Sequence, residues 1–181
     1  MTMQYFLFGG SIDHNAMRSI STGLTDAIND PSTTAVYFGL SSTGGSVTEG
    51  VALYHIIRAS PKPVTMHGIG NVDSIGVTIL LGGNQRYATP GTRFFFHPIG
   101  SGFQGTLTVP LMRTKIQALL SDHARVGAIY KDRGEVSDAE LEDLFNNEYM
   151  HDVAWAITHK FIQAQQDFMI PAGANVRNLT Q

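Results

Sequence analysis

Short apolar runs alternate with amphipathic stretches through the first half of the chain. The run from Gln4 to Phe8 predicts a buried strand, and apolar positions at helical spacing predict a helix that Asp13 caps and that continues towards Asn29. The same pair follows directly, with a strand over Thr34 to Leu40 and a helix over Val47 to Ala59. This alternation predicts an α/β fold with a largely parallel, well-covered sheet.

The pattern continues into the middle of the chain, where polar groups border apolar elements. We expect a strand over Val64 to His67, a loop over Gly68 to Asp73, a short apolar helix over Ser74 to Leu81 and a strand over Arg93 to His97. Sites in such sheets usually lie at the ends of the strands. Candidate chemistry is therefore expected where these elements begin and end.

Helices dominate the last third of the chain. Thr108 to Arg133 predicts one long helix with Pro110 in its first turn and Gly134 at its end. Ser137 to Glu140 has the spacing of a capping box that opens a short acidic helix, and Asp152 to Phe168 predicts a final amphipathic helix. A single domain over residues 1–170 and a flexible C-terminal tail over residues 171–181 are expected.

Composition narrows the classes of function. The chain has 12 Lys and Arg against 15 Asp and Glu, a net charge of −3, and no basic stripe, so nucleic acid is not an expected partner. The absence of cysteine excludes disulfides and thiolate sites, and the histidines lack zinc-binding spacing, so neither a metal nor a cofactor is expected. No apolar run approaches the ~18 residues of a membrane span. We therefore expect a soluble, cytoplasmic protein with no membrane partner.

Three places put reactive or ligand-binding groups beside apolar elements. Ser74 begins an apolar helix, where the helix dipole favours developing negative charge, although a serine there also suits a helix cap. His97 ends an apolar strand and suits a general base, although a backbone carbonyl would satisfy it equally. Gly44 and Gly45 either let backbone N–H groups approach a ligand or form a tight turn.

Four ordered motifs contain these places. Tyr5 to Asp13 reads YFLFGGSID, Val36 to Val47 reads VYFGLSSTGGSV, Gly70 to Gly76 reads GNVDSIG, and Arg86 to His97 reads RYATPGTRFFFH. Over about residues 5–163, they resemble the proteolytic subunit of the caseinolytic (Clp) protease, ClpP, within the crotonase-like superfamily. The resemblance implies an α/β, ClpP/crotonase-like fold of repeated strand-helix units with a long protruding helix.

The resemblance also implies an active site. Ser74 is then the nucleophile, His97 its base, and the N–H groups of Gly45 and Ile75 the oxyanion hole. The reaction is hydrolysis of peptide bonds through an acyl-enzyme, and the substrate is a peptide or an unfolded protein. Two backbone segments would bind that substrate as an added β-strand: Gly45, Ser46 and Val47, and Pro98, Ile99 and Gly100.

Assembly is implied as well, because ClpP-like subunits form rings. The long helix over Thr108 to Arg133 and the glycine-bearing segment over Gly100 to Gly105 are expected to build a homo-oligomeric ring. The chain starts at the first core strand, so we expect it to lack the N-terminal axial segment that helps to engage an ATP-driven unfoldase. Engagement of such an AAA+ partner is left open.

The sequence departs from the family where a catalytic aspartate would stand. The matching stretch has Asn147, and an amide cannot balance an imidazolium as a carboxylate does, so low activity is expected. Asp143, Glu148 and Asp152 are alternative third residues. The closing motif of the family is only echoed over Ala156 to Gln163.

Two alternative functions remain beside the serine endopeptidase. One is a catalytically weak or silent ClpP-like ring or scaffold subunit, which Asn147 favours. The other is a crotonase-type enzyme that uses the same oxyanion amides on an acyl-CoA thioester. The pairing of Ser74 with His97 argues against the crotonase alternative, because such enzymes usually work with carboxylates.

Overall fold

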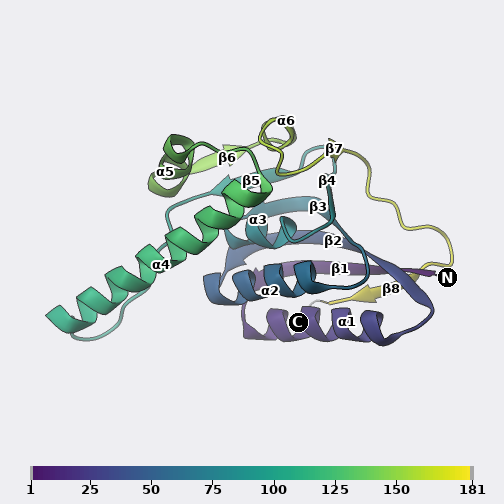
Figure 1. Cartoon of the computed structure of the whole chain (residues 1–181), viewed down its shortest axis with the longest axis horizontal. Coiled ribbons are helices and arrows are strands. Elements are labelled where there is room, and N and C mark those ends of the chain that lie inside the picture. Colours follow the sequence, from purple (N-terminus) through teal and green to yellow (C-terminus); the bar gives the residue numbers. More distant parts are fainter. Residues whose placement is uncertain (1, 180–181) are drawn as a thin grey trace.

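A mixed sheet with helices packed along it forms the body of the molecule (Figure 1). The computed structural model describes residues 2–179. Within them the strand order is β6-β5-β3-β2-β1-β8, and β4 pairs with both β3 and β7. The strands are β1 (Thr2–Ile12), β2 (Thr33–Gly45), β3 (Val64–Asp73), β4 (Gln85–Ala88), β5 (Arg93–Phe96), β6 (Tyr149–His151), β7 (Ala164–Gln165) and β8 (Asn175–Asn178). The helices are α1 (His14–Asn29), α2 (Val47–Ala59), α3 (Ile75–Leu80), α4 (Val109–Arg133), α5 (Asp138–Asn146) and α6 (Val153–Thr158).

The sheet is parallel except at one edge. β1, β2 and β3 pair in parallel, β4 and β5 both pair in parallel with β3, and β6 runs antiparallel to β5. α1, α2 and α3 lie side by side along the sheet and cover its apolar residues (Figure 1). The expected α/β fold is confirmed. Fully buried side chains at the centre include Phe6, Phe38, Leu40, Leu53 and Met66.

α4 is the element that departs from the compact body. Thr108 caps it, a proline stands in its first turn, and Gly134 ends it, as the sequence predicts. Its buried residues all lie between Val126 and Tyr130, near its C-terminal end. The N-terminal part projects away from the sheet (Figure 1). No helix within residues 2–179 is both long and apolar enough to cross a membrane.

A buried arginine joins the end of α4 to the chain beyond α6. Arg86, on β4, is 4% exposed. Its guanidinium donates to the carbonyls of Phe161 at 2.8 Å, Lys160 at 2.9 Å and Arg133 at 3.0 Å. Burial lowers the pKa of Arg86 to about 10, and these carbonyls stabilise the charge that burial disfavours.

The expected helix over residues 152–168 is wrong beyond Thr158. Lys160 adopts φ of +56°, which turns the backbone out of the helix. This turn places Phe161 and Ile162 in the core, where they are 0% and 1% exposed, and lets β7 pair with β4. The expected loop over residues 68–73 is also wrong, because β3 continues to Asp73 and pairs there with β5.

The expected lack of structure in the C-terminal tail is wrong over Asn175–Asn178. This segment forms β8 and extends the sheet in parallel beside β1. Leu179 follows it, is 1% exposed, and packs against Gly23 of α1. The side chain of Ser19 donates to the carbonyl of Leu179 at 3.1 Å. Of the predicted domain and tail, Met1, Thr180 and Gln181 lie outside the described residues.

Removing the Leu179 side chain should therefore destabilise the protein. We expect Leu179→Ala to lower the free energy of unfolding by about 2–5 kcal/mol, because the change leaves a cavity between β8 and α1. Val176→Ala on the same strand is the control; Val176 is 44% exposed and its change should stay within about 0.5 kcal/mol. Urea unfolding at one fixed protein concentration measures both. Equal values would contradict the packing described for Leu179.

Candidate active site

Ser74 lies at a sharp turn between β3 and α3. Its backbone has φ of 55° and ψ of −125°, a conformation that residues with a side chain rarely adopt. Its N–H donates to the carbonyl of Phe95 at 2.7 Å, which fixes the turn to the neighbouring strand. Such strain at a strand-to-helix turn is typical of a side chain that is displayed for chemistry.

The alternative interpretation of Ser74 as a helix cap is not supported. Ser74 occupies the N-cap position of α3, yet its side chain makes no capping hydrogen bond among the described residues. Asp13, Thr108 and Ser137, by contrast, each cap their helix through a side-chain oxygen. The Ser74 hydroxyl is therefore not committed to the backbone of its own helix.

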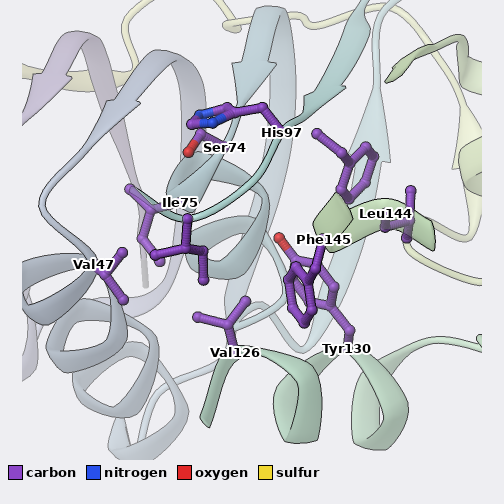
Figure 2. Close-up of a pocket in the computed structure, with 10 residues that line it drawn as sticks. Val47, Ser74, Ile75, His97, Val126, Tyr130, Leu144 and Phe145 are labelled. Atoms are coloured by element: carbon purple, nitrogen blue, oxygen red, sulfur yellow. The ribbon is translucent and has the colours of Figure 1, made fainter. Parts of the chain in front are cut away.

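His97 follows β5 and its ring lies beside Ser74 (Figure 2). Its Nδ1 lies 2.8 Å from the carbonyl oxygen of Pro98, and its ring stacks on Phe95 with centroids 5.5 Å apart. A carbonyl only accepts, so Nδ1 carries the proton, and in the neutral ring Nε2 is the basic nitrogen. A backbone carbonyl therefore satisfies one ring nitrogen of His97, Nδ1, as the alternative interpretation expected. The other nitrogen, Nε2, stays available to act as a base.

Both side chains border a small, mostly apolar pocket (Figure 2). Its interior volume is about 20 Å³, room for roughly one water molecule. The walls come from α2, α3, β5, α4 and α5, so the pocket forms only when these elements pack together. Its lining residues are Val47, Ser74, Ile75, Phe96, His97, Ile99, Val126, Tyr130, Leu144 and Phe145.

Two glycines bring the end of β2 against Ser74. A Cβ on Gly44 would lie 2.6 Å from the Ser74 Cβ, and a Cβ on Gly45 would lie 2.2 Å from the Ile12 carbonyl oxygen. Their φ values are +84° and +146°, so glycine is needed on both counts. Ile75 opens α3, and the first N–H groups of a helix have no partner within it. Gly44 thus lies against Ser74, and Gly45 and Ile75 are the next residues along the two elements that meet there.

Of the residues expected to bind substrate, some line the pocket and others make backbone or capping contacts beside it. Val47 and Ile99 line the pocket, whereas Ser46 caps α2 by accepting from the Glu49 N–H at 3.4 Å. Pro98 orients His97 through its carbonyl. Residues 97–100 have no regular secondary structure and are partly or fully exposed, so their backbone is accessible beside the pocket.

A family model described as Clp protease matches residues 2–164. The chain belongs to the Clp protease family. It is 34% identical over 96 residues to ATP-dependent Clp protease proteolytic subunit 1 of Leifsonia xyli subsp. xyli, covering 52% of this chain and 48% of that protein. It is 28% identical over 138 residues to proteolytic subunit 2 of Tropheryma whipplei (strain Twist), covering 75% of this chain and 76% of that one.

For the first relatives, the matched part is at most about half of their own length. The fold is also similar to that of a mutant ClpP1 from Listeria monocytogenes in which an asparagine is replaced by aspartate. The TM-score is 0.80 at 18% identity, and the match covers 91% of both chains. The resemblance to ClpP and the ClpP-like fold are thereby confirmed, while the roles of the site residues remain predictions.

Asn147, which the resemblance matched to a catalytic aspartate, is hydrogen-bonded within and next to its own helix. It is the C-cap of α5, and its side-chain amide donates to Asp143 Oδ1 at 2.8 Å. Among the described residues, Asn147 is not one of those that line the pocket with His97. Two of the alternative third residues have other surroundings. Asp152 caps α6 by accepting from the Trp155 N–H, and Glu148 is exposed.

One charged group beside Ser74 escaped sequence reasoning. Asp73, directly before Ser74, has a side chain that is only 8% exposed. Its Oδ2 lies 3.6 Å from Arg93, and no hydrogen-bond partner of Oδ1 lies within residues 2–179. The signal was present in the motif over Gly70 to Gly76, because a carboxylate there ends an apolar strand directly before the serine.

The close approach of Gly44 to Ser74 can be tested by adding one methyl group. Gly91 has nearly the same backbone, φ +80° against +84°, but open space around it. Gly91→Ala should cost about 1–2 kcal/mol for the left-handed backbone alone. Gly44→Ala should cost clearly more, because its methyl group also collides with Ser74. Chemical unfolding of both variants decides this, and equal losses would contradict the contact.

Proposed function

We propose that the chain is a ClpP-type serine endopeptidase subunit with Ser74 as nucleophile and His97 as base. The observation that carries the proposal is the strained, uncapped Ser74 beside a histidine whose Nδ1 is held by Pro98. That hydrogen bond leaves Nε2 to accept the hydroxyl proton. Membership of the Clp protease family supports the same chemistry.

The proposed reaction has two acyl-transfer steps. His97 Nε2 takes the proton of Ser74 as Oγ attacks the peptide carbonyl, and the protonated ring then gives this proton to the leaving amine. Water, activated by the same ring, hydrolyses the acyl-enzyme. The N–H groups of Gly45 and Ile75 would stabilise each tetrahedral oxyanion, and each such donor is worth about 2.7–4 kcal/mol in the transition state.

The substrate class follows from what surrounds these groups. The pocket walls favour an apolar side chain next to the scissile bond. Exposed backbone at Pro98–Gly100 on one side and Gly45–Val47 on the other would hold an extended peptide as an added strand. Such binding reads the main chain, which suits peptides and unfolded proteins of varied sequence.

The projecting part of α4 supports assembly into a homo-oligomeric ring. Val109, Met112, Ile116 and Leu120 are all large, apolar and exposed on this helix. Spacings of three and four residues place them on one side of it. An apolar stripe on a helix that projects from the body is costly in water unless another subunit covers it. Whether an AAA+ unfoldase binds the assembly is left open.

Ser74 and His97 should act as one unit. Ser74→Ala, His97→Ala and the double variant should all fall to about the same residual rate on a small peptide ester, because the base has no role without the nucleophile. A fluorophosphonate probe should label the wild-type protein at Ser74, as peptide mass spectrometry would show. His55→Ala is the control. His55 is exposed and does not line the pocket, so this variant should retain the wild-type rate.

Full hydrolysis by Ser74→Ala would refute the peptidase assignment. A wild-type protein that assembles but neither hydrolyses esters nor reacts with the probe would favour the alternative of a silent ring subunit. The arrangement of Asn147 with Asp143 is the observation behind that alternative, since no carboxylate is hydrogen-bonded to His97 among the described residues.

The assembly proposal predicts that the protein is not a monomer. Light scattering should give a mass that is a multiple of 19.7 kDa at micromolar concentration. The double change of Ile116 and Leu120 to aspartate should lower that mass, because it puts charge into the covered stripe. Thr22→Asp on α1 is the control and should leave the mass unchanged. A species of about 20 kDa for the wild-type protein would refute the ring.

A further inference from the structure

The proposed base lacks a hydrogen-bonded carboxylate in this structure. During acyl transfer His97 takes up a positive charge, and in serine peptidases an aspartate both orients the imidazole and stabilises that charge. Here the carbonyl of Pro98 orients the ring, but a neutral carbonyl supplies no full negative charge. Asn147 is engaged with Asp143. The stabilising charge must therefore come from elsewhere, if the site is active.

Asp73 is a buried carboxylate beside β5, the strand that leads to His97. It pairs in register with Phe95, so the two side chains leave the sheet on the same side. Phe95 stacks on His97, and Arg93, two residues before Phe95, reaches Asp73 Oδ2 at 3.6 Å. Asp73 thus lies beside Phe95 and pairs with Arg93, and Phe95 in turn stacks on His97.

The surroundings of Asp73 leave part of its charge uncompensated by hydrogen bonds. Oδ1 is buried and has no hydrogen-bond partner among residues 2–179, and the Arg93 distance exceeds that of a hydrogen bond. Arg93 is also 44% exposed, so water screens its charge. Burial raises the pKa of Asp73, whereas the positive charges of Arg93 and His97 lower it. Asp73 is therefore a buried carboxylate with an unpartnered oxygen, and it lies beside the ring that stacks on His97.

We infer that Asp73 is a positioning residue that stabilises protonated His97 electrostatically, while the Pro98 carbonyl orients its ring. The two roles of a single catalytic aspartate would then be divided between a carboxylate next to the nucleophile and a backbone carbonyl next to the base. This inference rests on the proposed peptidase function for its catalytic consequence. The electrostatic link between Asp73 and His97 can be measured without activity.

The side chains that line the pocket together with His97 are uncharged. α2, α3 and α5 contribute only apolar side chains to the pocket, and α4 adds Tyr130. Burial raises the pKa of Tyr130, so its hydroxyl stays neutral. On the strands beside it, Asp73 and Arg93 form an ion pair next to Phe95, which stacks on His97. A change in the titration of His97 on altering Asp73 would therefore report on this one pair.

The first experiment follows the reaction of His97 with diethylpyrocarbonate against pH, resolved by peptide mass spectrometry. The reagent modifies the neutral imidazole only, and a Ser74→Ala background removes the competing hydroxyl. A neighbouring carboxylate raises the pKa of a histidine. Adding Asp73→Asn should therefore move the midpoint of the profile to lower pH, by about one unit, a tenfold change in protonation. Adding Asp26→Asn, which removes an exposed aspartate paired with Arg177, should leave it unchanged.

The second experiment measures ester hydrolysis with Ser74 intact. Asp73→Asn should lower kcat about tenfold or more with little change in KM, because the stabilised charge exists only as the proton is transferred. Circular dichroism checks that the variant is folded. Arg93→Gln is the second variant: it breaks the same ion pair but keeps the carboxylate, so it should not lower the His97 midpoint. A purely structural ion pair would make both variants change the midpoint alike.

The outcomes separate the inference from the proposed function. An unchanged His97 midpoint in Asp73→Asn, or an unchanged kcat in an enzyme that depends on Ser74, would overturn the role of Asp73. A lowered midpoint with a lowered kcat supports it. If hydrolysis by the wild-type protein does not depend on Ser74, the peptidase proposal fails, and the midpoint alone still decides whether Asp73 and His97 interact. If Asp73→Asn does not fold, Arg93→Gln decides: a raised His97 midpoint supports the inference, and a lowered or unchanged midpoint overturns it.

Discussion

The left-handed backbone of Ser74 is the constraint on which the surrounding structure depends. A residue with a side chain holds such a conformation only when its neighbours enforce it, at a cost of about 1–3 kcal/mol. Here the Phe95 carbonyl fixes the Ser74 N–H, and Gly44 leaves room for the side chain. Gly50 permits the next residue, Ile75, to seat α3 against α2, since a Cβ on Gly50 would lie 2.2 Å from Ile75. Contacts from two strands and two helices thus surround this one turn.

The same arrangement shows how a parallel sheet builds a pocket from distant parts of a chain. Ser74 follows the end of β3 and His97 follows the end of β5, while Gly44 and Gly45 end β2. The end of α4 and the following helix then close the apolar wall with Tyr130 and Phe145. α4 therefore contributes to the pocket wall near its C-terminal end, while its N-terminal part projects away from the body (Figure 1).

Local signals predicted most of the elements around the site but not the contacts between them. The bounds of α2, the cap of α1 at Asp13 and the capping box at Ser137 follow from short-range chemistry, and the structure confirms them. The turn at Lys160 and the strand β8 depend on what Phe161 and Leu179 meet in the folded core, which periodicity does not encode. Asp73 was missed for the same reason, since only the pairing of β3 with β5 places it beside Phe95, which stacks on His97. The motifs selected Ser74 and His97, whereas the orientation of Asn147 towards Asp143 needed the structure.

The hydrogen bonds of the buried Arg86 guanidinium limit when its part of the sheet can be completed during synthesis of the chain. Its carbonyl partners lie 47, 74 and 75 residues further along the sequence. At a synthesis rate of about 5–20 residues per second, the last of them follows Arg86 by roughly 4–15 s. Until then the guanidinium must stay hydrated, because burying it without partners is prohibitively costly. The sheet can therefore assemble from β1 to β3 early, but the side that holds β4 stays open until Phe161 has been made.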